Sequence, residues 1–139
     1  MSNGFSHATE IRVRYAETDA MQVVYHGNYL VYFENARTEM LRAMGLPYSE
    51  VERLGLYIVV VEAHAHYKKP AYYDDLLQVN AILSELPSVK LRIDYEITRK
   101  ATAELLVTGY TVHTFFNKST NRPARPLKEF IDVVQKYFH

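Results

Sequence analysis

The chain has 139 residues, enough for one domain with a single core and too few for two. Its 16 basic and 16 acidic side chains cancel, so no overall field favours nucleic acid or a membrane surface as a partner. The absence of cysteine excludes disulfides, thiolate metal sites and cysteine nucleophiles. The first residues lack the basic and apolar regions of a signal peptide, and no apolar run approaches the roughly 20 residues of a membrane span. We therefore expect one cytoplasmic domain over residues 1–139.

The first expected elements are a strand and a long helix. Residues 10–15, "EIRVRY", alternate, with Ile11, Val13 and Tyr15 on one face, as in a strand with one solvated side. After a loop, Asn28 is a candidate N-cap for a helix that ends before "GLP". Its first turns are apolar nearly all round, which predicts burial on most sides. The apolar positions at helical spacing are Tyr29, Tyr32, Phe33, Ala36, Met40 and Met44, widened by Leu30, Val31 and Leu41.

Four more strands and a last helix follow a short helical or irregular connection. The strands are expected at residues 57–69, 74–86, 89–99 and 103–117, joined by short turns, which favours an antiparallel sheet. In the third of them the inward positions are Val89, Leu91, Ile93, Tyr95 and Ile97. The last helix places Leu127, Phe130, Ile131, Val134 and Phe138 on one stripe. Because one long helix covers only one face of such a sheet, we expect an oligomer partner to cover the rest.

The loop and helix form a motif. The block "RVRYAETDAMQVVYHGNYLVYFENARTEMLRAMGL" resembles the signature of hotdog-fold acyl-CoA thioesterases of the 4-hydroxybenzoyl-CoA thioesterase family, in the branch typified by the thioesterase associated with the Tol–Pal genes. The resemblance continues through "VVVEAHAHYKKPAYYDDLLQV" and "LRIDYEI". It implies an α+β hotdog fold, with an antiparallel sheet of about five strands wrapped around one long central helix, plus a C-terminal helix. It also implies a dimer or tetramer with active sites at the dimer interface.

The resemblance assigns roles near the start of the helix. Asp19 matches the family's catalytic carboxylate in "TDAMQVVYH", and the backbone at His26 and Gly27 matches the group that polarises the thioester carbonyl. The His26 ring stands where this branch carries histidine, and Glu34 falls where an acidic residue reaches the acyl pocket. We therefore expect Asp19, His26 and Glu34 to be catalytic.

Substrate contacts are expected at four further residues. Gln22, Tyr25 and Tyr29 are candidates to shape the acyl pocket, and Lys90 is a candidate contact for the phosphates of coenzyme A. Gln22 departs from the family pattern, which usually has glycine there, so the backbone or pocket width beside Asp19 is in question. The expected substrate is an acyl-CoA or acyl-carrier thioester. No cofactor is expected beyond coenzyme A itself, which is part of substrate and product.

Thioester hydrolysis needs an attacking oxygen and stabilisation of the negative charge that develops on the carbonyl oxygen. Free backbone N–H groups at a helix N-terminus supply the stabilisation, because the donors and the helix dipole point outward. A carboxylate supplies the other part, as nucleophile or as general base toward water. The sequence does not choose between these two roles for Asp19.

Simpler interpretations exist for the same residues. Asp19 is also suited to hydrogen-bond its own turn, His26 to donate at the helix entry, and Glu34 to pair with Arg37 or Thr38. The same fold hosts acyl-thioester hydratases and dehydratases, and a non-catalytic acyl-thioester binding module is a further alternative.

A metal site is the remaining candidate. His64 and His66 lie on one face of an expected strand together with Glu62, a common spacing for zinc or iron ligands. No third ligand is fixed by spacing, and a half-exposed strand face explains the pair, so no metal is expected.

Overall fold

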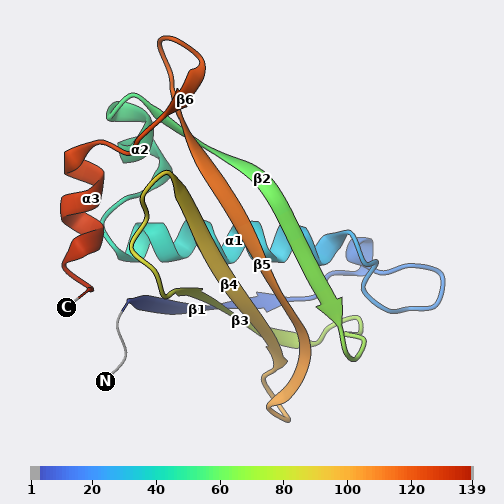
Figure 1. Cartoon of the computed structure of the whole chain (residues 1–139). Coiled ribbons are helices and arrows are strands. Elements are labelled where there is room, and N and C mark those ends of the chain that lie inside the picture. The colour runs from blue at the N-terminus through green and yellow to red at the C-terminus, as the bar shows by residue number, and fades with distance from the viewer. Residues whose placement is uncertain (1–3, 139) are drawn as a thin grey trace.

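An antiparallel sheet packs against one long helix in the computed structural model, which describes residues 4–138 (Figure 1). The strands are β1 (Phe5–Arg12), β2 (Leu56–Tyr67), β3 (Leu76–Leu83), β4 (Lys90–Arg99), β5 (Glu104–Asn117) and β6 (Arg122–Ala124). The helices are α1 (Asn28–Ala43), α2 (Tyr48–Arg53) and α3 (Lys128–Gln135), with a 3₁₀ turn at Tyr15–Glu17. In the described part of the chain, no helix is long and apolar enough to cross a membrane.

The sheet has the strand order β1-β3-β4-β5-β2, with the short β6 beside β5. Every pair is antiparallel, and α1 lies across one face (Figure 1). Side chains on β3 and β4 alternate between the buried helix side and the more open outer side, as strand geometry requires. The predicted α+β hotdog architecture, with its long central helix and C-terminal helix, is confirmed.

The core forms where α1 meets the sheet. The rings of Phe33 and Tyr95 stack with centroids 4.3 Å apart, and both are buried. Gly109 on β5 allows this packing, because a Cβ there would lie 2.3 Å from the His64 carbonyl oxygen and 2.7 Å from the Phe33 ring. The six apolar helix positions predicted for the core are all buried: Tyr29, Tyr32, Phe33, Ala36, Met40 and Met44.

Several boundaries differ from the sequence prediction. β1 begins at Phe5 and ends at Arg12, because its backbone pairs with β3 from Phe5 opposite Leu83 to Arg12 opposite Leu76. Backbone pairing does not need the apolar alternation that the prediction relied on. Tyr15 was predicted to point inward, but it lies in the 3₁₀ turn and is 78% exposed. Val89 was likewise predicted inward, but it precedes β4 and is exposed.

Two predictions about the first turn of α1 are wrong. Asn28 is the first helical residue rather than the N-cap, which is Gly27. The Asn28 side chain instead donates from Nδ2 to the Glu17 carbonyl oxygen at 2.9 Å. Leu30 and Val31 are 40% and 54% exposed in the single chain, so the helix is not buried on most sides.

The exposed apolar surface lies along the edge strand β2, while the outer face of the sheet carries polar groups. β2 pairs with β5 on one side, and the described chain places no strand on its other side. Val59, Val60 and Val61 on this edge are exposed, and Val60 shares a cavity lining with Leu30 and Val31 of α1. On the outer face, the Arg92 guanidinium lies 4.1 Å from the Tyr110 ring centroid. Coverage of the chain by an oligomer partner stays a prediction.

The C-terminal helix closes one end of the core. Phe130 and Val134 of α3 are buried, and the Phe130 ring lies 5.3 Å from that of Phe115 on β5. The Tyr137 carbonyl accepts a hydrogen bond from the Gly4 N–H at 2.8 Å, which ties this end of the chain to the start of β1. The opposite end of α1 is left for the loop that contains Asp19 (Figure 1).

Candidate active site

The loop before α1 contains a tight turn at Asp19. The Gln22 N–H donates to the Asp19 carbonyl at 2.9 Å, and the Asp19 N–H donates to the Val23 carbonyl at 2.9 Å. Gln22 has φ of 65°, the left-handed conformation that glycine adopts most easily. The backbone therefore keeps the shape that a glycine would favour, at a cost of about 1 kcal/mol for a residue with a Cβ.

The Asp19 carboxylate uses one oxygen for its own turn. Its Oδ1 accepts a hydrogen bond from the Met21 N–H at 2.8 Å, the local role that the simpler interpretation expected. Its other oxygen has no hydrogen-bond partner in residues 4–138, and the side chain is exposed. The turn thus fixes the orientation of the carboxylate and leaves one oxygen available.

Glu17 fastens this loop to the helix. Its carbonyl accepts hydrogen bonds from the Tyr25 N–H and from Asn28 Nδ2, both at 2.9 Å. Its carboxylate accepts from the Tyr32 hydroxyl at 3.0 Å and from the Arg14 N–H at 2.9 Å. Burial raises the pKa of Tyr32, and the hydrogen bond to Glu17 raises it further, so the phenol stays a donor at neutral pH. Sequence reasoning missed Glu17, because its role depends on contacts eleven to fifteen residues away.

The start of α1 presents free backbone donors. The Asn28 N–H donates to the Tyr25 carbonyl at 2.9 Å, and the Tyr29 N–H to the His26 carbonyl at 3.3 Å. The N–H groups of His26 and Gly27 have no acceptor within residues 4–138. They lie just before the positive end of the helix dipole, which suits them to stabilise negative charge.

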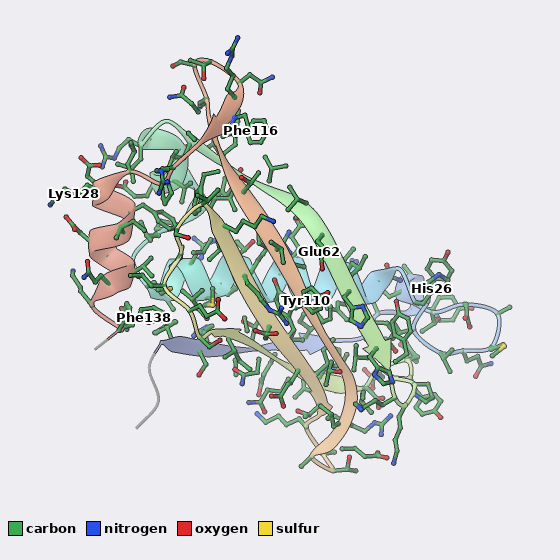
Figure 2. The ribbon with its side chains drawn as sticks, viewed as in Figure 1. His26, Glu62, Tyr110, Phe116, Lys128 and Phe138 are labelled. Atoms are coloured by element: carbon green, nitrogen blue, oxygen red, sulfur yellow. The ribbon has the colours of Figure 1, made fainter. Side chains whose placement is uncertain are left out.

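A cavity of about 330 Å³, termed the thioester cavity below, lies at this end of α1. It brings together Asp19, His26 and Tyr29, three of the residues predicted from the sequence. Its remaining lining is Val23, Val24, Tyr67, Lys68, Lys69 and Pro70. Figure 2 shows His26 close to the end of β2, where the Tyr67 hydroxyl donates to the His26 carbonyl at 3.3 Å. No sequence pattern assigned a site role to Tyr67 or to the residues after it, because only the fold brings them to the start of α1.

The other predicted site residues lie elsewhere in the single chain. Glu34 is exposed and lines two neighbouring cavities, while Lys90 begins β4 at the end of the sheet opposite to Tyr67. Gln22 and Tyr25 are exposed and are not part of the thioester cavity lining. The Tyr25 ring instead packs on His26, with centroids 4.4 Å apart.

Two of the three residues considered for a metal, Glu62 and His64, have other partners. Glu62 accepts a hydrogen bond from the Tyr110 hydroxyl at 2.6 Å (Figure 2). The His64 ring stacks on Tyr110 with centroids 5.3 Å apart. The described residues contain no group of three or more His, Asp or Glu placed to hold a metal ion.

A second cavity, termed the distal cavity below, lies beside the middle and the later turns of α1. Its volume is about 320 Å³, and its lining is Glu34, Arg37, Thr38, Leu41, Tyr48, Ile58, Leu91, Ile93 and His113. His113 is only 1% exposed and ends a buried hydrogen-bond chain. In that chain the Tyr95 hydroxyl lies 2.6 Å from Thr111 Oγ1, which lies 2.8 Å from His113 Nε2. Burial, and secondarily the Arg37 guanidinium, lowers the pKa of His113 to about 4.

Comparisons with known proteins identify the superfamily of this chain. Residues 13–135 match the Thioesterase-like superfamily, and the chain belongs to it. Over 100 residues it is 38% identical to the acyl-CoA thioesterase YbgC of Haemophilus influenzae, covering 71% of this chain and 72% of that protein. The predicted enzyme class, a thioesterase with the hotdog fold, is confirmed.

Solved structures agree with this membership. The DHNA-CoA thioesterase of Staphylococcus aureus has a TM-score of 0.87 and 31% identity, covering 94% of this chain and 89% of that chain. The hypothetical protein TT1821 of Thermus thermophilus has a TM-score of 0.88 and 36% identity, covering 97% of this chain and 99% of that chain.

The buried His113 predicts an acid-sensitive contribution to stability. Its folded pKa lies below its unfolded value of about 6.5, so the unfolded chain binds the proton more readily. The contribution is therefore complete above about pH 6.5 and is lost as the pH falls toward 4. Urea unfolding of wild type and His113→Gln at pH 7.5 and pH 4.5 measures it. The stability difference, wild type minus variant, should shrink at pH 4.5 by on the order of 2 kcal/mol. A difference that does not change with pH would contradict the assignment.

Proposed function

We propose that this chain hydrolyses acyl-CoA thioesters to a carboxylate and free coenzyme A. The observation that carries the proposal is the pair of free N–H groups at His26 and Gly27, next to the thioester cavity that Asp19 lines. The names of relatives support the substrate class, since YbgC of Haemophilus influenzae is an acyl-CoA thioesterase.

In this mechanism the thioester carbonyl oxygen accepts hydrogen bonds from the backbone N–H groups at the start of α1. These donors are fixed before the reaction, because α1 is held by its buried face and by Glu17. Negative charge that develops on the carbonyl oxygen meets donors and a helix dipole that need no rearrangement.

Asp19 supplies the attacking oxygen in one of two ways. Its free oxygen attacks the carbonyl carbon and expels the thiolate, giving a mixed anhydride that water then hydrolyses. Alternatively, it takes a proton from water, and the resulting hydroxide attacks. Both routes consume one water and give the same carboxylate and thiol. The His26 ring orients the carbonyl or the water. Glu34 lines the acyl pocket or positions water. No cofactor takes part.

We also propose that two copies of the chain pair along β2. Within residues 4–138 the outer edge of β2 offers unpaired backbone groups, and its exposed Val60 shares a cavity lining with Leu30 and Val31 of α1. Antiparallel pairing of two β2 strands reverses their directions, so Lys90 of one copy is carried toward the Tyr67 end of the other. This arrangement supports a role for Lys90 beside the partner's thioester cavity, and a dimer or tetramer as the working form.

Within the superfamily, we place the chain in the branch associated with the Tol–Pal genes. The support is the block around "TDAMQVVYHGNY", in which the resemblance matches His26 to the histidine of this branch. An acyl-carrier thioester is the alternative substrate to acyl-CoA in this proposal.

The catalytic role of Asp19 predicts the effect of Asp19→Asn. The amide oxygen of asparagine can still accept from the Met21 N–H, so the turn should survive while the charge is lost. Thiol release from a panel of acyl-CoAs, followed with a chromogenic thiol reagent, should fall by roughly 100- to 10,000-fold. Asp132→Asn, on α3, is the control and should leave the rate unchanged.

Near-normal turnover by Asp19→Asn would remove the proposed mechanism. Turnover of enoyl-CoA by wild type without thiol release would instead assign the hydratase class. Binding of acyl-CoA without any turnover would assign the binding module.

The proposed β2 interface predicts a change in mass for Val61→Lys. Val61 is 52% exposed on the free edge, and a lysine there would place a charge between two copies. Light scattering during size-exclusion chromatography should give a dimer or tetramer for wild type and a monomer for the variant. Leu127→Lys, an exposed apolar position before α3, should keep the wild-type mass. A monomeric wild type would contradict the interface.

A further inference from the structure

The distal cavity contains a half-buried cation without a counterion. Arg37 lines the cavity and forms no ion pair with any carboxylate of residues 4–138. Arg42, on the same helix, shows the ordinary case, since its guanidinium pairs with Glu39 at 3.2 Å and is exposed. Partial burial of an unpaired charge is unfavourable, so the Arg37 guanidinium is suited to bind an anion.

Other polar groups line the cavity beside Arg37. The Thr38 hydroxyl lines the cavity, and His113 Nδ1 is buried and has no hydrogen-bond partner in the described chain. The one carboxylate in the lining, Glu34, belongs to an exposed residue. The remaining lining residues come from α1, α2, β2 and β4 and are apolar apart from the Tyr48 hydroxyl. The cavity therefore combines apolar walls with a positively charged polar group.

The distal cavity and the thioester cavity both lie along α1. A third cavity of about 230 Å³, lined by Leu30 and Val31, shares Glu34 and Arg37 with the distal cavity. Leu30, Glu34 and Arg37 follow His26 at spacings of four, four and three residues, which places them along one face of α1. Arg37 lines both cavities, and the third cavity extends from Arg37 toward the first turns of α1 at Leu30 and Val31.

We infer that the distal cavity is an acyl-specificity site, in which Arg37 binds a carboxylate at the far end of the acyl group. The substrate class is then the coenzyme A monothioester of a dicarboxylic acid. This inference rests on the proposed thioesterase function, because the acyl group must extend along α1 from the His26 end. The methylene groups of the acyl chain pack against the apolar walls, and Arg37, Thr38 and His113 surround the terminal carboxylate.

Binding to the Asp19→Asn protein tests this inference without turnover. Isothermal titration calorimetry would compare succinyl-, glutaryl- and adipoyl-CoA with butyryl-, pentanoyl- and hexanoyl-CoA, pairs matched in carbon number. At least one dicarboxylic thioester should bind about 10-fold or more tightly than its alkyl match. Arg37→Met in the same background should remove the difference, and Arg37→Lys should restore part of it. Arg42→Met, on the same helix, should leave it intact.

The outcomes separate this inference from the proposed function. Binding of all acyl-CoAs without preference, or a preference that survives Arg37→Met, overturns the specificity site and leaves the thioesterase proposal standing. Absence of binding by any acyl-CoA overturns both. A preference lost together with a change in oligomeric mass assigns Arg37 to the contact between copies and also overturns the inference. Light scattering on the same samples provides that readout.

Discussion

The contacts of Glu17 are the constraint on which the candidate site depends. One residue accepts two hydrogen bonds on its carbonyl and more on its carboxylate, and these join the loop at residues 15–27 to the first turns of α1. The Tyr32 hydroxyl that reaches it comes from a side chain whose ring is buried in the core. The position of the exposed Asp19 turn is therefore set by the packing of the helix against the sheet.

The buried helix explains why polar groups gather at its start. Its apolar stripe needs the sheet as cover, while its first N–H groups need acceptors that the core does not offer. The fold leaves the His26 and Gly27 donors at the end of the sheet, where Tyr67 of β2 and the Asp19 turn meet them. A carboxylate and free N–H groups next to one cavity are the parts that thioester hydrolysis requires. The same helix, farther along, carries Arg37 into the distal cavity.

Much of the fold could be predicted from the sequence because periodicity reports burial directly. The spacing of Tyr29, Phe33, Ala36 and Met40 predicted the buried face of α1, and alternation predicted the buried face of β4 from Leu91 to Ile97. The early start of β1 was not predictable in this way, since its pairing with β3 uses backbone groups. The exposure of Val31 was missed because helical periodicity does not show whether a neighbour belongs to the same chain.

The candidate site was predictable only where a motif names residues close in sequence. Asp19 and His26 lie in one motif, and the structure places both in the lining of one cavity. Glu17 and Tyr67 lie within the resembling blocks, but the resemblance assigned neither a role, because their contacts depend on chain segments that the fold brings together. The distal cavity was likewise not predictable, since Arg37 and His113 lie on different elements and no sequence pattern links them.

The most direct measurement of the central claim is a crystal structure with a non-hydrolysable acyl-CoA analogue, in which a methylene group replaces the thioester sulfur. The ketone oxygen should lie within about 3.2 Å of the His26 or Gly27 nitrogen, with the free Asp19 oxygen facing the carbonyl carbon. An analogue bound with its ketone oxygen away from the start of α1 would contradict the proposed oxyanion site.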